Sequence, residues 1–384
     1  MQLLLMSVGL LTLGYLVFTL IELKIGFNNI TNLADQPEVS AAELPKISII
    51  LSALDEEKMI AQAVTSLLNL NYPELEVITI NDRSTDNTAS ILESLKQQHP
   101  NLQVHHITQL PDGWLGKNHA LHFAAARAQG EWLLFTDADV LMKPDTLLKT
   151  ISYALEHKLD HLTIYEYHQR KQFWLRISLL GNYIAYVMAL KPWRIRHSWS
   201  KKSLGHGSFN LVKKTAYENC GGHQAIALEC LDDLRLGQLI KRNGFKQDTA
   251  NGQDFIEREW YASLKDMIAG MQKNCFAFFN YQLFTTLGIC FLTVVFYIWP
   301  LLAAFIYTGT LCYINLINVA LTGTISVYVA EQFRLKRWHA VFYPIAIGIL
   351  IYTMLNSVIA TYRNKGVIWR GTLYPLKLLR KGAG

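Results

Sequence analysis

The sequence predicts an α/β domain built on a mostly parallel sheet, with an N-terminal transmembrane anchor and a C-terminal transmembrane region. Three short apolar runs, each ending in acidic residues, predict the sheet: they lead to Asp55, to Asp82, and to the pair Asp137 and Asp139. Runs rich in Ile and Val that alternate with helical segments are typical of βα units, and ligands bind such sheets beyond the carboxyl ends of the strands. We therefore expect the acidic residues to meet at one edge.

Long uncharged segments predict the membrane region. Only 17% of the 384 residues are charged, and the mean hydropathy is +0.15. Residues 1–21 hold no charge and can cross a bilayer, whereas a cleaved signal peptide would carry a basic region before a shorter apolar core. Residues 274–330 are also uncharged, which fits two spans with a turn near 304–309, and residues 340–361 would add a third.

The charge distribution predicts an integral, multi-pass protein of the cell membrane with a cytoplasmic catalytic domain. The net charge is +6, and cations gather at 334–337 and 363–381, which marks faces that touch anionic lipid. No recognition helix or stacking platform accompanies them, so nucleic acid is not an expected partner. The five cysteines show no paired spacing, which argues against a disulfide framework or a zinc site and favours a reducing compartment.

The expected organisation has one conflict. Three spans after a cytoplasmic domain would place the basic tail outside, against the positive-inside tendency. Either one of the apolar stretches is re-entrant and does not cross the membrane, or the basic tail is an exception to the positive-inside tendency. The apolar segment Phe173–Pro192 is interrupted by Arg176 and is expected to pack on the sheet or to lie at the membrane surface. The expected parts are an anchor (1–22), the α/β domain (45–258), an interfacial amphipathic helix (259–275), a region of about three spans (276–362) and a basic interfacial tail (363–384).

Two motifs predict chemistry from their residue types. An Asp-X-Asp such as Asp137-Ala-Asp139, directly after a buried strand, suits a hard cation such as Mg²⁺ or Mn²⁺ whose coordination is completed by diphosphate oxygens. Lys117 and His119 open a helix, where a cation and backbone N–H groups favour phosphate. Both point to a nucleotide-sugar donor.

The acidic motifs resemble those of family 2 glycosyltransferases with a Rossmann-like GT-A fold. The resemblance rests on Asn81-Asp82-Arg-Ser-Thr-Asp86, on Asp137-Ala-Asp139 and on Asp232-Asp233-Leu-Arg-Leu-Gly. The segment Gly113-Trp-Leu-Gly-Lys117-Asn118-His119 is similar to membrane-bound members that act on isoprenoid lipids, of the hopanoid-associated and diaponeurosporenoate types. The resemblance covers Ile47 to about Lys273 well and the membrane region loosely.

The resemblance implies a role for each motif. The family has a Glu-Asp pair whose second residue is the general base, a role that would fall to Asp233. At the first position this chain has Asp instead of the family's Glu. Asp139, with Asp137, would hold the metal. The expected donor-binding residues are Asp55, Asp82, Lys117, His119 and Asp137, the acceptor side would comprise His206, Gly207 and Asp232, and Arg370 would contact the diphosphate.

The function that follows is metal-dependent, inverting transfer of a single sugar by a hexosyltransferase. The donor would be a UDP-sugar, with UDP-glucose the first candidate, and the acceptor a membrane lipid or an isoprenoid-type acceptor. A processive polysaccharide synthase is the first alternative, but its Gln/Arg-X-X-Arg-Trp motif is missing where the chain reads Met271-Gln-Lys-Asn274. Arg334-Leu-Lys-Arg337-Trp338 matches the letters about a hundred residues after the acidic pair, between two expected spans, and is interpreted as a cytoplasmic basic loop. A non-catalytic GT-A-like membrane protein is the second, and it would be expected to have lost Asp139 or Asp233.

Overall fold

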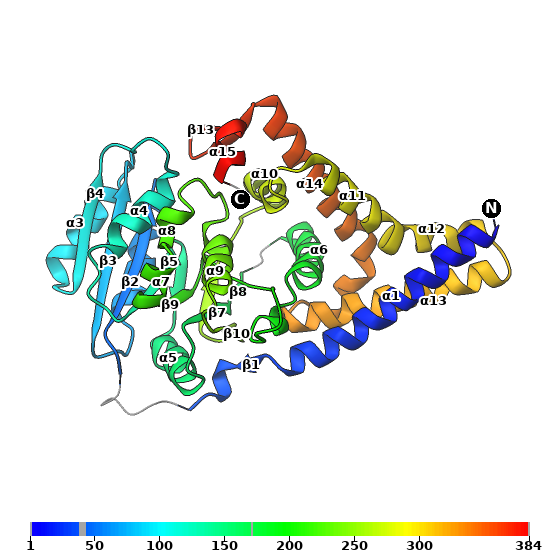
Figure 1. Ribbon diagram of the computed structural model, residues 1–384, viewed down its shortest axis with the longest axis horizontal. Helices are drawn as coiled ribbons and strands as arrows, with labels where there is room; N and C mark the ends of the chain where they lie inside the picture. Colours follow the sequence, from blue (N-terminus) through cyan, green and yellow to red (C-terminus); the bar gives the residue numbers. More distant parts are fainter. Residues whose placement is uncertain (1, 38–43, 170–171, 383–384) are drawn as a thin grey trace. The chain divides into compact units, whose positions relative to one another are not determined.

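The computed structural model describes residues 2–37, 44–169 and 172–382, which form two compact units. The α/β unit comprises residues 30–169 and 192–260. The helical unit comprises residues 1–29, 170–191 and 261–380. Each unit is thus assembled from segments that are distant in the sequence (Figure 1).

An eight-stranded sheet forms the centre of the α/β unit, in the order β1-β10-β7-β9-β5-β2-β3-β4. Neighbouring strands are parallel except β9, which runs antiparallel to both β5 and β7. The predicted mostly parallel sheet is therefore confirmed. The strands are β1 (Thr31–Asn32), β2 (Ile47–Ala53), β3 (Leu75–Asp82), β4 (Leu102–Ile107), β5 (Trp132–Asp137), β7 (His161–Tyr165), β9 (Asn210–Lys213) and β10 (Gln247–Asn251).

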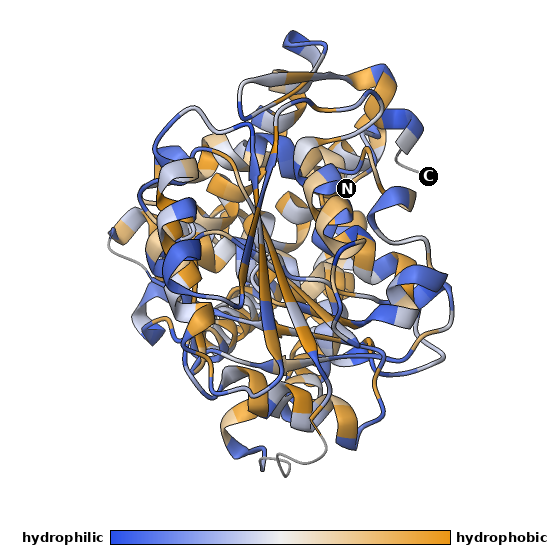
Figure 2. Ribbon diagram, turned by 90° about the vertical axis from the view of Figure 1, so that its left-hand side faces the viewer, coloured by the Kyte–Doolittle hydropathy of each residue, from blue (hydrophilic) through white to orange (hydrophobic). Residues whose placement is uncertain are grey.

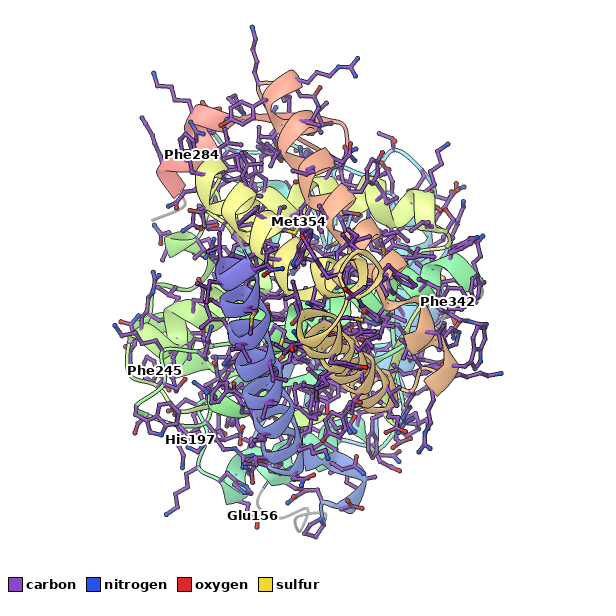
Figure 3. The ribbon with its side chains drawn as sticks, turned by 90° about the vertical axis from the view of Figure 1, so that its right-hand side faces the viewer. Glu156, His197, Phe245, Phe284, Phe342 and Met354 are labelled. Carbon is purple, nitrogen blue, oxygen red and sulfur yellow. The ribbon has the colours of Figure 1, made fainter. Side chains whose placement is uncertain are left out.

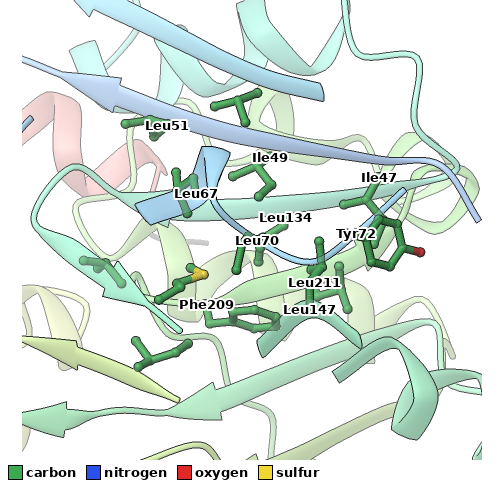
Figure 4. Packing of buried hydrophobic residues seen from close by; sticks show 14 of the residues in the cluster. Ile47, Ile49, Leu51, Leu67, Leu70, Tyr72, Leu134, Leu147, Phe209 and Leu211 are labelled. Atoms are coloured by element: carbon green, nitrogen blue, oxygen red, sulfur yellow. The ribbon is translucent and has the colours of Figure 1, made fainter. Parts of the chain in front are cut away.

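Alternating residues of the strands divide the core into two layers, one on each face of the sheet. On β2, Ile47, Ile49 and Leu51 pack on one face (Figure 4), and Ile50 packs on the other. Figure 2 shows that the strands at the centre carry long hydrophobic stretches and that the helices around them carry hydrophilic ones. The first layer is covered by α2 (Ile60–Leu68), α3 (Thr88–Gln98) and α5 (Thr146–Glu156), and the second by α4 (Gly116–Ala125), α7 (Lys214–Asn219) and α9 (Asp232–Arg242). The short elements η1 (Leu33–Asp35), η3 (Pro192–Arg194) and α8 (Gly222–Ala225) complete the unit.

A second, three-stranded sheet has the order β6-β11-β8. Its strands are β6 (Val140–Met142), β8 (Tyr167–His168) and β11 (Ile256–Arg258). On β11, Arg258 is paired with Val140 on one side and with His168 on the other. Because β6 directly follows Asp139, this register brings Arg258 to the Asp-X-Asp motif.

The helical unit contains the long apolar helices, seen together in Figures 1 and 3. They are α1 (Gln2–Asn28), α6 (Phe173–Leu190), α10 (Leu264–Phe278), α11 (Leu283–Thr293), the π-helical turn η4 (Val294–Ile298), α12 (Trp299–Ile306), α13 (Thr310–Gln332), η5 (Arg337–Phe342) and α14 (Tyr343–Arg363), followed by the hairpin β12 (Gly366–Trp369) and β13 (Thr372–Pro375) and by α15 (Leu376–Gly382). Chain direction reverses between α12 and α13 at 307–309, where Gly309 has a φ of 66°. The turn expected near 304–309 is therefore present.

Five described helices are long and apolar enough to cross a membrane: Gln2–Asn28, Phe173–Arg194, Leu283–Ile306, Thr310–Gln332 and Arg337–Arg363. They indicate membrane association. Helix α6, expected on the sheet or at the membrane surface, packs on helices of its own unit, and its position at the membrane surface stays a prediction. A Cβ on Gly181 would lie 2.5 Å from the Ala346 carbonyl oxygen of α14, and Tyr183 stacks on Phe333 at 4.2 Å between ring centroids.

Other expected elements differ locally. The helix expected over 259–275 begins at Leu264, because Ser263 caps it: the Ser263 hydroxyl oxygen accepts from the Asp266 backbone N–H at 3.1 Å. The preceding Trp260 stacks on His168 of the α/β unit instead, at 5.1 Å between centroids. The segment 204–209, which contains the expected acceptor-side residues His206 and Gly207, is a loop until β9 begins at Asn210.

Candidate active site

Lys117 and Asp137 form the centre of the site. Asp137 ends β5, and Lys117 lies in the first turn of α4. The Lys117 ammonium donates to Asp137 Oδ1 at 2.7 Å and lies 2.9 Å from Oδ2 of Asp232. Burial alone would lower the pKa of Lys117, but Asp137, Asp232 and Asp233 outweigh burial and raise it. Lys117 therefore stays charged and joins the strand-end acid to the acidic pair.

A second cation, Arg258, holds the Asp-X-Asp motif from the other side. Its guanidinium donates to Asp137 Oδ2 at 3.1 Å and to Asp139 Oδ2 at 2.9 Å. The Arg258 side chain is only 11% exposed. Both oxygens of Asp137 are thus engaged by cations, one by Lys117 and one by Arg258.

The remaining oxygen of Asp139 fits a metal ion. Asp139 Oδ1 is buried and accepts no hydrogen bond from any described residue. A buried carboxylate oxygen without a donor is costly unless a cation binds it. In the described part of the chain no group of three or more His, Cys, Asp or Glu side chains could hold a metal by itself. Asp139 would therefore supply one ligand, with donor phosphate and water oxygens as the others.

The acidic pair opens α9. Asp232 is buried, and Asp233 follows with its Oδ1 accepting from the Leu234 backbone N–H at 2.7 Å. Burial, then the charges of Asp232 and Asp137, raise the pKa of Asp233 to about 6, and Lys117 opposes the rise. A carboxylate with this pKa is a better proton acceptor than an ordinary Asp and is still largely ionised at neutral pH.

The loop before β9 runs between the donor side and the acidic pair. A Cβ on Gly205 would lie 1.9 Å from the Asp233 carbonyl oxygen, and one on Gly207 would lie 2.5 Å from Asp137 Oδ2. Glycine is required at both positions, because a side chain at 205 would displace the backbone of Asp233 and one at 207 would displace the carboxylate of Asp137. His206, between them, lines a small pocket with Lys117 and Asp233. Burial lowers the pKa of His206.

The residues expected to bind the nucleotide lie near the start of α4. Both oxygens of Asp82 accept from the Arg83 guanidinium, at 2.8 and 2.9 Å. A Cβ on Gly116 would lie 2.6 Å from Asp82 Oδ2, so this glycine lets α4 begin against the ion pair. His119 Nδ1 is buried with no described hydrogen-bond partner. Asp55 accepts from the Thr85 backbone N–H at 2.7 Å and so ties two loops together; whether it also binds donor stays a prediction.

The structure therefore brings together Lys117, Asp137, Asp139, Asp232, Asp233, His206 and Gly207. Arg370 lies in the tip of the β12–β13 hairpin of the helical unit, and its contact with a diphosphate remains a prediction. Sequence reasoning missed Arg258 and also Glu166, whose carboxylate contacts His168 at 3.0 Å and Ser208 at 2.8 Å. The only sequence signal for Arg258 was that apolar and charged residues alternate in Ile256-Glu-Arg258. That pattern is too short to predict a strand.

Arg258 should control metal affinity through Asp139. In Arg258→Lys a single ammonium cannot reach two carboxylates in the fork geometry of a guanidinium. We expect Mn²⁺ to bind roughly 10–100-fold more weakly, the usual loss when a partner of a metal ligand is removed. Calorimetry with Mn²⁺ and UDP would measure it. Arg196→Lys is the matched control, because Arg196 makes a similar pair with Asp248 at 3.0 Å. Equal affinities in both variants would contradict the role of Arg258.

Comparison with known proteins relates the chain to glycosyltransferases. Residues 48–220 match the family described as Glycosyl transferase family 2. The chain is 27% identical over 233 residues to 4,4'-diaponeurosporenoate glycosyltransferase of Staphylococcus haemolyticus, covering 59% of this chain and 60% of the relative. It is 29% identical over 207 residues to beta-monoglucosyldiacylglycerol synthase of Nostoc, covering 52% of this chain and 42% of the relative. The matches thus span about half of each protein.

A solved structure shares the fold. The mannosyltransferase PcManGT from Pyrobaculum calidifontis, in complex with GDP-Man and Mn²⁺, aligns with a TM-score of 0.53 at 16% identity, covering 94% of this chain and 98% of that one. Residues 48–220 thus resemble family 2 glycosyltransferases, and the chain shares the GT-A type of fold with this solved structure.

Proposed function

We propose that the protein transfers a single sugar from a UDP-sugar, with UDP-glucose the first candidate, to a hydroxyl or carboxyl of a membrane lipid, with inversion. The observation that carries the proposal is the bridge made by Lys117, which contacts Asp137 at the end of β5 and Asp232 at the start of α9. This bridge holds the diphosphate side and the proton-accepting side of one site within the length of one side chain.

Asp233 acts as the general base. Its carboxylate takes the proton of the acceptor hydroxyl as that oxygen attacks the anomeric carbon. The bond from that carbon to the diphosphate oxygen breaks, and its electron pair leaves with the diphosphate. One displacement inverts the configuration at the anomeric carbon. Lys117 and Arg258 stand beside Asp137 and offset negative charge at the leaving side.

A divalent ion, Mg²⁺ or Mn²⁺, held by Asp139 would neutralise charge on the leaving diphosphate, so that this group needs no proton. Asp137 serves that site differently. Its oxygens are engaged by Lys117 and Arg258, so it orients those cations and leaves the ligand role to Asp139. This division refines the expectation that both aspartates hold the metal.

The acceptor is proposed to be a lipid for two reasons. The named relatives are a diaponeurosporenoate glycosyltransferase and a beta-monoglucosyldiacylglycerol synthase, and both names specify lipids. The chain also has long apolar helices joined to the glycosyltransferase domain by short connections, with α10 beginning at Leu264 soon after β11 ends at Arg258. A processive polysaccharide synthase is less well supported, because it needs a polymer channel and a Gln/Arg-X-X-Arg-Trp motif at the active site. The matching letters of this chain, Arg334-Leu-Lys-Arg337-Trp338, lie about a hundred residues after the acidic pair, just before α14.

Labelled donors test the proposal. Membranes that contain the full chain would be incubated with radiolabelled UDP-glucose, UDP-galactose, UDP-N-acetylglucosamine and GDP-mannose, with Mg²⁺ or Mn²⁺, and the lipids then extracted. We expect label from one UDP-sugar in a single lipid product. The GDP-sugar is included because the structural neighbour binds GDP-Man. Membranes with the Asp233→Asn variant serve as the control. Label in a polymer that stays in the aqueous phase would favour the synthase.

A further inference from the structure

The connections between the elements do not allow each of the five apolar helices to cross the membrane once. Strand β7 precedes α6 and strand β9 follows it, yet the two strands are hydrogen-bonded neighbours in one sheet, with Leu162 opposite Leu211. A single crossing by α6 would leave these strands on opposite sides of the membrane. Helix α6 therefore begins and ends on the same side. We call this the domain side, the side from which α1 continues into β1 at Thr31.

Helix α13 ends on the domain side. It runs parallel to α1: near its start the Asn318 side chain donates to the Gly9 carbonyl oxygen at 3.0 Å, and at its end Phe333 contacts Phe27 with ring centroids 6.2 Å apart. Because Phe27 is one residue from the domain-side end of α1, Phe333 is on that side too. The next helix, α14, follows after the two turns of the short 3₁₀ helix η5 and so begins on the domain side.

Helix α14 also ends on the domain side. Its Ser357 hydroxyl accepts from the Phe276 backbone N–H at 3.0 Å and donates to the Gln272 carbonyl oxygen, both in α10. Helix α10 follows directly on the α/β unit and, at 15 residues or about 22 Å, is too short to span the hydrocarbon core. Beyond α14, the Lys273 ammonium of α10 lies 3.8 Å from the ring centroid of Trp369, and Arg380 donates to the Tyr281 carbonyl oxygen at 3.2 Å.

The outer face of α14 is apolar. Ile345, Tyr352 and Ile359 are 44%, 58% and 64% exposed, and their spacing of seven residues puts them on one face. The opposite face is buried against helices of the same unit, including Ala346 and Ser357. Exposed basic residues flank both ends of the helix: Arg334, Lys336 and Arg337 before it, and Arg363 and Lys365 after it.

We propose that α14 does not cross the bilayer but lies in the leaflet on the domain side, with Ile345, Tyr352 and Ile359 among the acyl chains of anionic phospholipids. An apolar face between two basic clusters fits the surface of an anionic bilayer, where acyl chains lie beneath negatively charged headgroups. Helices α1, α11–α12 and α13 then make three crossings. The basic tail lies on the side of the glycosyltransferase domain, which removes its conflict with the positive-inside tendency.

Single cysteines test the number of crossings in the full chain, with the native cysteines replaced by serine. A membrane-impermeant maleimide would be applied to sealed vesicles of each orientation. We expect Lys336→Cys, Lys365→Cys and Lys201→Cys of the glycosyltransferase domain to react in the same vesicles, and Thr308→Cys in the opposite ones. Labelling of Lys365→Cys together with Thr308→Cys would show that α14 crosses and would overturn the proposal. A reporter fused to the unmodified chain's C-terminus gives the same answer without substitutions.

Spin labels at Ile345→Cys, Tyr352→Cys and Ile359→Cys test what covers the face. We expect all three to be relaxed by oxygen and shielded from a water-soluble nickel complex, at one common depth. A transmembrane helix would instead place the label at 352 deeper than the other two. Labels shielded from both relaxers would mean that a protein surface covers this face, and labels open to nickel would mean that water does. Either result contradicts the proposal.

Discussion

Asp139→Asn should reduce sugar transfer at least about a thousandfold, the largest loss that we expect from a single substitution. Asn has nearly the same volume, and its amide oxygen can still accept from Arg258, which contacts Asp139 Oδ2 at 2.9 Å. What disappears is the negative charge behind the buried Oδ1, which has no described donor. A Lewis-acid metal contributes several kcal/mol to such a transition state, and about 1.4 kcal/mol is tenfold in rate.

Turnover of labelled lipid by the purified protein, at saturating donor and ordinary metal concentration, measures this loss. Asp145→Asn is the matched control, since Asp145 is exposed at the start of α5 and its Oδ1 accepts from Asn71 at 3.0 Å. We expect the control to retain wild-type turnover and both variants to unfold at the wild-type temperature. Near wild-type turnover of Asp139→Asn would remove Asp139 from the metal site.

Asp233→Asn should lower the rate by about a hundredfold or more, since general-base catalysis supplies about that factor. Donor binding should change little, because Asp233 acts on the acceptor. Asp232→Asn is the informative comparison: Asp232 contacts Lys117 at 2.9 Å, so its loss should weaken donor binding as well. Calorimetry with a UDP-sugar separates the two. A collapse of donor affinity in Asp233→Asn, with the rate per bound complex preserved, would make Asp233 a binding residue.

The pH dependence of the transfer rate also tests the assignment of Asp233 as the general base. The base form of Asp233 is the ionised one, which is present above its pKa, and burial with neighbouring Asp232 and Asp137 raises that pKa to about 6. The wild-type rate should therefore rise with pH up to about 6 and level off above it. This step should be missing from the residual rate of Asp233→Asn. A wild-type rate that is flat from pH 5 to 8 would contradict the assignment.

Local signals in the sequence were sufficient for the residues at strand ends. Asp82 and Asp137 each close a buried, largely apolar strand, and parallel strands bring such ends to one edge. For these two residues the position in the fold follows from one element and its neighbour. The acidic pair Asp232 and Asp233 was singled out by its resemblance to the family motif, and the structure places it in the first turn of α9.

The sequence did not predict site residues whose positions depend on the pairing of elements far apart in the chain. Arg258 reaches Asp139 across 119 positions of sequence through a three-residue strand, and no local pattern specifies that pairing. The apolar pattern of α6 predicted a helix on the sheet or at the membrane surface but did not specify α14 as its partner, where a Cβ on Gly181 would lie 2.5 Å from the Ala346 carbonyl oxygen. The start of α10 was predictable, because Ser263-Leu-Lys-Asp266 is a capping sequence.

The anomeric configuration of the product lipid tests the central claim most directly. A UDP-hexose donor such as UDP-glucose carries its sugar in the α-configuration, so one displacement assisted by Asp233 must give a β-glycoside. The purified full chain would be supplied with the donor identified from the labelled panel and the lipid product examined by proton NMR. We predict an anomeric proton with the large coupling of a diaxial pair, and the small coupling of an α-glycoside would contradict inversion at this site.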